Sequence, residues 1–274
     1  MTVRPGWGEP APALVTLHLW RVPGWRVPAA VTRMGLDRRA VRRAPGVRFA
    51  KLLGTGRGQT FTLRDAEPRR WGLLAAWADA GAAASFERSV TVHRWHRLAE
   101  ETWRVELRPL SSRGRWSGRE PFGPSRAGPG TAGRPGADGS DAGRPGAGGR
   151  PVGIGGGQPG PGRWTGVVAA VTRARLVPWR AARFWRAVPA VSADLRGRAG
   201  LRLAVGIGEA PVGLQGTFSV WESARALRSF AYAGAAHAAA VRRTPVEGWY
   251  AEELFARFAV LSATGTVDGR DPLA

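Results

Sequence analysis

Trp71-Gly-Leu-Leu-Ala-Ala-Trp77 is an apolar run of strand length, and Thr217-Phe-Ser-Val-Trp221 matches it in the second half of the chain. The tryptophans that end the two segments are 144 residues apart (221 − 77). Two further pairs keep this separation, namely Phe86 with Phe230 and His93 with His237. Farther along, Gly114-Arg-Trp-Ser-Gly-Arg-Glu-Pro121 matches Gly265-Thr-Val-Asp-Gly-Arg-Asp-Pro272 at a separation of 151 (265 − 114). Because the matches follow one order, the sequence predicts an internal duplication.

The hydrophobic pattern around these segments predicts similar elements in each half, in the order β-α-β-β-α-β. In the first half we expect strands at 15–20, 47–53, 71–77 and 103–110, a helix at 25–43, and a second helix from Ala80 that Asp79 caps. In the second half we expect strands at 167–172, 201–205 and 217–221, and a helix at 179–188.

Two such units are expected to form an α+β fold with two ferredoxin-like halves, residues 14–122 and 164–272. Each sheet would carry helices on one side, and the two apolar faces would close around an apolar cavity. Dimeric α/β-barrel monooxygenases build this architecture from two chains, and here it is predicted within one chain. Gly54-Thr-Gly-Arg-Gly58 and Gly206-Ile-Gly208 lack the phosphate-binding pattern and are predicted to be tight turns at strand ends.

Residues 123–163 differ in kind from the two halves. They are rich in glycine and proline and contain no aromatic residue. Such a segment buries too little apolar surface to offset the entropy lost on ordering. We therefore expect a disordered linker between the two halves.

The chain has a formal net charge of +21, as many proteins that bind nucleic acid or anionic membranes do. Lys51 is the only lysine, and the arginines are scattered, mostly in pairs. This distribution favours a solvated basic surface over a nucleic-acid partner, and attraction to anionic lipid stays open. No apolar run approaches the roughly 20 residues that cross a bilayer, and no signal-peptide pattern is present. We expect a cytoplasmic protein, with peripheral contact at the inner face of the membrane.

Residues 230–258 carry the strongest candidate for a cofactor ligand. His237 lies in an alanine-rich run predicted to be helical, followed by Gly248-Trp-Tyr250 and a predicted helical turn at 252–258. The chain has no cysteine, so histidine, tyrosine and methionine are the side chains left for a haem ligand. Small neighbours would let a flat macrocycle approach His237, whereas a surface histidine on a good helix is the alternative. His93 is expected to be exposed and His18 to be structural.

Several motifs together resemble the spheroidene monooxygenase family, the acyclic carotenoid 2-ketolases of bacterial carotenoid pathways. They are Phe49-Ala-Lys-Leu-Leu-Gly-Thr-Gly-Arg-Gly58, Ala75-Ala-Trp77, Gly114-Arg-Trp-Ser-Gly118, Val205-Gly-Ile-Gly-Glu209, and the stretch from His237 through Gly248-Trp-Tyr250 to Phe258. The resemblance covers both halves. It implies a haem enzyme that oxidises the end of a long linear carotenoid such as spheroidene with molecular oxygen and electrons from reduced ferredoxin. It also implies that His237 is the axial ligand of the haem iron, while His93 and His96 have no counterpart in the family pattern.

Trp77, Trp221, Phe218 and Phe230 lie on segments that are expected to face the barrel interior, where an apolar polyene would lie against them. Aromatic side chains are also ordinary core residues, so substrate contact and plain packing both stay open. Residue spacing indicates no carboxylate pair or Ser-His-Asp arrangement, so the catalytic side chains stay unknown and oxygen activation would belong to the cofactor. A cofactor-free barrel that binds or oxygenates another apolar ligand is the alternative function.

Overall fold

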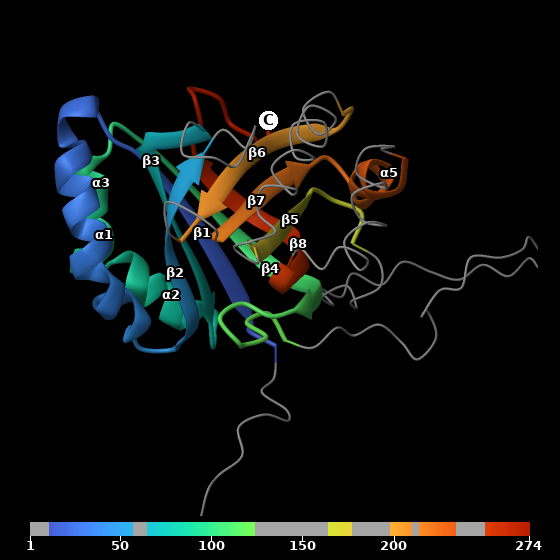
Figure 1. The fold of residues 1–274 in the computed structure, drawn as a ribbon, viewed down its shortest axis with the longest axis horizontal. Coiled ribbons are helices and arrows are strands. Elements are labelled where there is room, and N and C mark those ends of the chain that lie inside the picture. Colours follow the sequence, from blue (N-terminus) through green and yellow to red (C-terminus); the bar gives the residue numbers. More distant parts are fainter. Residues whose placement is uncertain (1–10, 57–64, 124–163, 177–197, 210–213, 234–249) are drawn as a thin grey trace, which may run out of the picture.

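A computed structural model describes residues 11–56, 65–123, 164–176, 198–209, 214–233 and 250–274 of the chain (Figure 1). They form an α+β fold made mostly of antiparallel strands. The strands are β1 (Leu14–Arg21), β2 (Val47–Gly56), β3 (Ala66–Trp77), β4 (Glu101–Gly114), β5 (Val168–Leu176), β6 (Leu201–Gly208), β7 (Leu214–Trp221) and β8 (Tyr250–Gly265). The helices are the 3₁₀ helix η1 (Gly24–Arg26), α1 (Val27–Arg42), α2 (Ala80–Glu87), α3 (Val90–Leu98) and α5 (Ala224–Ala233). The predicted linker at 123–163, apart from Gly123, and the predicted helix at 179–188 lie outside the described residues.

The strands pair in the same order in each half of the chain. β1 pairs with β3 and β4, and β2 pairs with β3, which gives the order β2-β3-β1-β4. The last four strands have the order β6-β7-β5-β8. The pairs β2–β6 and β4–β8 join the two sets, so the antiparallel sheet closes on itself. Strands from both halves therefore surround one interior.

The two glycine segments lie within strands and pair with each other. Gly54, Thr55 and Gly56 on β2 face Gly208, Ile207 and Gly206 on β6, respectively. The prediction of tight turns is therefore wrong for these residues. Glycine does favour turns, but here its backbone N–H and C=O groups take part in the pairing that joins the two halves.

Helices cover the outer face of the first half. α1, α2 and α3 lie on the same side of the sheet (Figure 1), and their inner side chains form one hydrophobic cluster with its outer face. The single helix predicted after Asp79 is two helices: Asp79 caps α2 by accepting from the N–H of Ala82 at 2.7 Å, and Ser89 caps α3 by accepting from Val92 at 3.3 Å. No helix in the described ranges is long and apolar enough to span a bilayer.

The inner face of the closed sheet holds the main hydrophobic core. Every strand from β1 to β8 contributes buried side chains to it. Aromatic rings pack there at close range: Phe122 meets Phe258 edge to face with centroids 4.9 Å apart, and Phe49 lies 5.4 Å from Trp116. This packing joins the two halves through side chains as well as through the sheet.

β8 replaces the helical turn predicted at 252–258. Leu254, Ala256 and Phe258 are buried, whereas Ala251 and Arg257 are exposed, which is the alternation of a strand. The residue types in this stretch favour a helix by intrinsic propensity. Pairing with β4 on one side and β5 on the other, together with burial of every second side chain, overrides that preference.

Matched positions after β4 and β8 share an uncommon backbone geometry. Gly114 and Gly265 have φ angles of +88° and +86°. Ser117 and Asp268, which match at the same separation in the sequence, have φ angles of +56° and +54°. Few non-glycine residues adopt this left-handed conformation, so the two turns are built alike.

Candidate functional site

The four aromatic residues predicted to face the interior divide between the two faces of the sheet. Phe218 is fully buried in the interior core, with its ring centroid 6.2 Å from that of Trp103. Trp77 and Trp221 lie on the outer, helix-covered face, and Phe230 of α5 stacks on Trp221 at 5.3 Å. The predicted orientation is therefore wrong for Trp77, Trp221 and Phe230. An apolar strand that is buried on both faces does not reveal which of its residues point inward.

The described histidines lie outside the interior. His18 is 2% exposed on the helix-covered face, where its Nε2 lies 2.8 Å from Glu87 Oε2. His93 and His96 are exposed on α3, as expected for His93. His237 lies outside the described residues, so its role stays a prediction.

Among the residues that the structure describes, Lys51 on β2 and Arg173 on β5 are cations that face the interior. Lys51 lies between Phe49 and Leu53, which belong to the interior core at alternate positions of the strand. Arg173 follows Val171 in the same way and is only 3% exposed. Because a buried charge is costly unless it is paired and hydrogen-bonded, the partners of these two side chains define a site.

Glu209, directly after β6, binds both cations. Its Oε2 lies 2.5 Å from Lys51 Nζ, and its Oε1 lies 3.2 Å from Arg173 Nη2. Oε1 also accepts a hydrogen bond from the indole N–H of Trp116, and Lys51 donates to Ser117 Oγ at 2.7 Å. One carboxylate thus ties β2 and the turn after β4, both in the first half, to β5 in the second.

Glu252, near the start of β8, is the second anion of this site. Its carboxylate accepts hydrogen bonds from the backbone N–H groups of Ser117 at 2.9 Å and Gly118 at 2.7 Å, and from Nη1 of Arg173. Burial alone would raise the pKa of Glu252, but the two backbone hydrogen bonds and the Arg173 guanidinium outweigh it and hold the pKa below its ordinary value. The carboxylate is therefore ionised at neutral pH.

The guanidinium of Arg173 stands at the centre of the arrangement. It lies over the ring of Trp116, 5.4 Å from the centroid, and its Nε has no hydrogen-bond partner among the described residues. We call the set the buried charge network, because Arg173 and Trp116 at its centre are buried; its other members are Lys51, Glu209 and Glu252, which are partly buried, and Ser117 and Gly118, which are exposed. Two cations and two carboxylates balance, so this network can position groups and donate a hydrogen bond without adding net charge to the interior.

The buried charge network adjoins the segment that carries His237. Residues 234–249 end where β8 begins at Tyr250, and Glu252 follows two positions later. Because Glu252 is held by the turn after β4 and by Arg173, it fixes the strand end to which that segment is attached. The network therefore holds the N-terminal end of β8, which follows residues 234–249 in the sequence.

Apart from Arg173, the network residues lie in motifs that carry the family resemblance, yet none of their charged side chains was predicted as a site residue. The available signal was a charge at an inward position of an otherwise apolar strand, as at Lys51 between Phe49 and Leu53. The partner carboxylates carry no such local signal, because their distance from Lys51 and Arg173 depends on how the strands pair.

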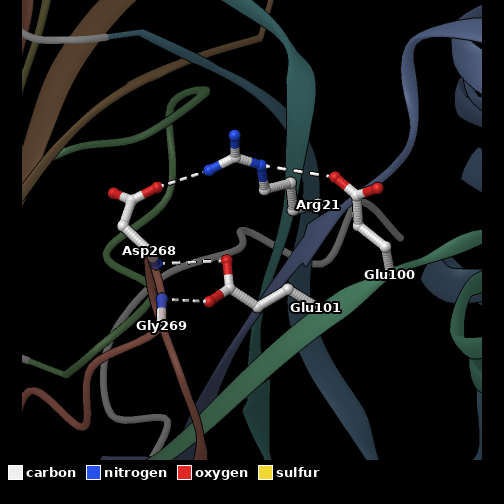
Figure 2. A pocket seen from close by; sticks show the side chains of 5 residues that line it. All are labelled: Arg21, Glu100, Glu101, Asp268 and Gly269. Carbon is white, nitrogen blue, oxygen red and sulfur yellow. Dashed lines mark hydrogen bonds and ion pairs between the residues drawn. The ribbon is translucent and has the colours of Figure 1, made fainter.

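An exposed counterpart lies at the matched turn after β8 (Figure 2). There Glu101 accepts the backbone N–H groups of Asp268 at 3.1 Å and Gly269 at 2.7 Å, the same pattern as in the buried charge network. Asp268 also lies 2.6 Å from Arg21, whose Nε lies 3.4 Å from Glu100. These five residues line a shallow pocket. Since Asp268 is 60% exposed, solvent screens its charge, and the buried network is the stronger candidate for a functional role.

The fold is shared with aldoxime dehydratases. One crystal structure of aldoxime dehydratase covers 90% of this chain and 80% of its own, with a TM-score of 0.54 and 12% identity. A second, in complex with butyraldoxime, covers 95% and 86%, with a TM-score of 0.51 and 12% identity. At this identity the likeness defines the class by fold alone: an α+β protein with a closed antiparallel sheet.

Sequence relatives identify the family within this class. The spheroidene monooxygenase of Rhodobacter capsulatus is 34% identical over 267 residues, which cover 95% of each chain. That of Rubrivivax gelatinosus is 37% identical over 227 residues, covering 82% of this chain and 73% of its own. No family model matches the chain. The chain belongs to the spheroidene monooxygenase family, as its motifs predict.

Proposed function

We propose that this protein is a haem-dependent carotenoid monooxygenase that oxidises the end of an acyclic carotenoid such as spheroidene to a ketone. Molecular oxygen is the oxidant, and reduced ferredoxin supplies the electrons. The observation that carries the proposal is the 34% identity over 95% of the chain to a protein named spheroidene monooxygenase. Haem, ferredoxin and the ketone product are expectations from the family resemblance.

The proposed axial ligand is His237. When bound, haem supplies the activation of oxygen. The donor set supports this choice, because His18 is engaged with Glu87, and His93 and His96 are exposed on the outer helix layer. A haem iron needs one protein ligand, whereas a bare ion needs several, and the described ranges contain no group of three or more His, Cys, Asp or Glu side chains suited to that.

The chain's own residues would bind and orient the substrate. The interior core is apolar and aromatic, which suits a polyene. Phe218, packed against Trp103, is the predicted substrate-binding residue that faces this interior. The buried charge network would hold the N-terminal end of β8 in one position through Glu252. Arg173 Nε–H and the indole N–H of Trp103 are buried donors without a hydrogen-bond partner among the described residues, and either would be able to orient an oxygen atom.

The repeated strand order supports the finer proposal of two ferredoxin-like halves that arose by duplication. The like turns at Ser117 and Asp268 support it further, since both halves place a carboxylate on the N–H groups of that turn. In this proposal the second-half carboxylate, Glu252, became part of a buried site, while its first-half counterpart, Glu101, stayed near the surface.

A carotenoid dissolves in bilayers, so we also propose that the protein works at the cytoplasmic membrane surface as a peripheral protein. It would draw the substrate from the membrane and receive electrons from ferredoxin on the water side.

Product analysis tests the proposal. Purified protein with haem, spheroidene in detergent, and chemically reduced ferredoxin should give a product that gains oxygen from isotopically labelled O₂. Omitting ferredoxin or O₂ should abolish the product. Unchanged spheroidene in the complete mixture, with haem bound, would remove the proposed activity.

A further inference from the structure

Exposed apolar side chains gather on the helix layer of the first half. The described chain has five exposed large hydrophobic residues, and four of them belong to η1, α1 and α3: Trp25 at 74%, Val31 at 54%, Leu36 at 65% and Val90 at 60%. The fifth, Leu261 at 44%, lies on β8. Because α1 and α3 contact each other and lie on the same side of the sheet (Figure 1), the four side chains share one surface layer.

The same layer is basic. Arg38, Arg39, Arg42 and Arg43 are exposed at the C-terminal half of α1. The acidic residue of this helix, Asp37, is buried and lies 3.5 Å from Arg33. The outer face of α1 therefore presents cations and apolar side chains without an exposed acid.

Trp25 stands out among these residues. The residue is 74% exposed, and the guanidinium of Arg26 lies 4.4 Å from the ring centroid. Arg26 in turn donates to the backbone carbonyl of Arg97 on α3, which fixes the base of the pair. An indole held outward beside a cation suits the boundary between water and lipid, where tryptophan and arginine are enriched.

We propose that the outer face of η1, α1 and α3 docks on an anionic bilayer, with Trp25 and Leu36 inserted among the headgroups and the arginines of α1 on lipid phosphates. This inference deepens the proposed function, because a substrate dissolved in lipid gives such a surface its purpose. Arginine charge alone would equally suit an acidic protein. Two bulky, largely exposed apolar side chains beside the charge favour lipid, since each contributes only when it leaves water.

Vesicle co-sedimentation of the full chain tests the surface without any need for turnover. Wild type should sediment with vesicles of phosphatidylcholine and phosphatidylglycerol, much less with phosphatidylcholine alone, and less at high salt. Trp25→Ser with Leu36→Ser should weaken partitioning by about tenfold or more. Arg39→Gln with Arg42→Gln should weaken it on anionic vesicles by about thirtyfold, at roughly 1 kcal/mol for each of the two charges. Leu261→Ser is the matched control and should partition like wild type.

These substitutions lie at exposed positions, and an unchanged urea midpoint verifies that each variant folds. Failure of wild type to bind anionic vesicles, or an equal loss in Leu261→Ser, would overturn the inference. The inference would also be overturned if the arginine variants lost binding to an acidic protein but still bound anionic vesicles like wild type. Oxidation of detergent-dispersed carotenoid separates the two proposals: it should persist in the Trp25 and Leu36 double variant, and its absence in wild type would count against the activity and leave the docking result standing.

Discussion

Lys51 Nζ lies 2.5 Å from Glu209 Oε2, and this ion pair joins β2 of the first half to the end of β6 in the second. The side chains are 20% and 15% exposed, so solvent screens the pair only in part. Glu209 also holds Arg173 and the indole of Trp116. The chain's only lysine thus forms a contact between the two halves.

Breaking this pair should cost more stability than breaking an exposed one. Lys51→Met leaves Glu209 with one cation fewer in a mostly buried site, and we expect the free energy of unfolding to fall by roughly 2–4 kcal/mol. Arg69→Gln breaks the Arg69–Glu100 pair, whose side chains are 40% and 38% exposed, and should cost about 1 kcal/mol or less. Urea unfolding measures both. Equal losses in the two variants would show that the network contributes no special stability.

Gly265 should resist substitution by alanine. Its φ is +86°, and a Cβ there would lie 2.0 Å from the carbonyl oxygen of Thr102. Backbone must shift to admit it, so Gly265→Ala should destabilise the fold by about 3 kcal/mol or more. Gly269 is the matched control, because its φ is +74° and no atom lies within 4 Å of a Cβ; Gly269→Ala should cost about 1 kcal/mol. Thermal unfolding of the two variants tests the difference, and similar midpoints would contradict the close approach of β4 and β8.

Acid should weaken the fold partly through Glu252. The folded-state pKa of Glu252 lies below its ordinary value of 4.5, so the unfolded chain takes up this proton at a higher pH than the folded one. The stabilisation is therefore fully present above about pH 4.5 and is lost as the pH falls through the lower folded pKa. Glu252→Gln should be less stable at neutral pH and should lose less stability on acidification. Parallel stability curves for variant and wild type between pH 6 and about 3 would rule out this contribution.

The two faces of the sheet predict different effects of aromatic substitutions. Phe218 faces the interior, so Phe218→Leu should raise the KM for carotenoid by roughly two- to tenfold, the worth of one aromatic contact. Trp77 faces the helices and donates its indole N–H to Thr16 Oγ1 at 2.9 Å. Trp77→Phe should lower the free energy of unfolding by about 1–3 kcal/mol and leave KM unchanged. Steady-state kinetics and urea unfolding of both variants test whether Phe218 faces the substrate and Trp77 faces the helices. A change in KM in Trp77→Phe but not in Phe218→Leu would contradict this assignment.

Much of the fold followed from hydrophobic period and matched segments. The first-half strands and α1 overlap the segments that the hydrophobic pattern predicts, and α2 begins after the predicted Asp79 cap, whereas α3 was not predicted as a separate helix. The helix predicted at 252–258 failed because propensity is local, whereas the strand partners of Leu254 and Phe258 are distant in sequence. The prediction of turns at 54–56 and 206–208 failed for the same reason. These two segments form strand ends by pairing with each other, and they are far apart in the sequence.

The candidate site was harder to predict than the fold. His237 drew attention because histidine is scarce in this chain, but such a choice names a residue without its surroundings. Lys51 and Arg173 are site candidates because their side chains face the interior. Which side of a strand faces the interior depends on which face of the sheet the helices cover, and the local sequence does not determine that. Trp77 and Trp221 illustrate the opposite case. Their large apolar side chains were predicted to face the interior, but they pack on the helix-covered face of the sheet.

The absorption spectrum of purified protein reconstituted with haem tests the central claim most directly. Wild type should show a Soret band, His237→Ala should lose or shift it, and added imidazole should restore it. His96→Ala, a change at an exposed histidine, should leave the band unaltered. No Soret band in wild type, or an identical spectrum in His237→Ala, would contradict haem ligation by His237.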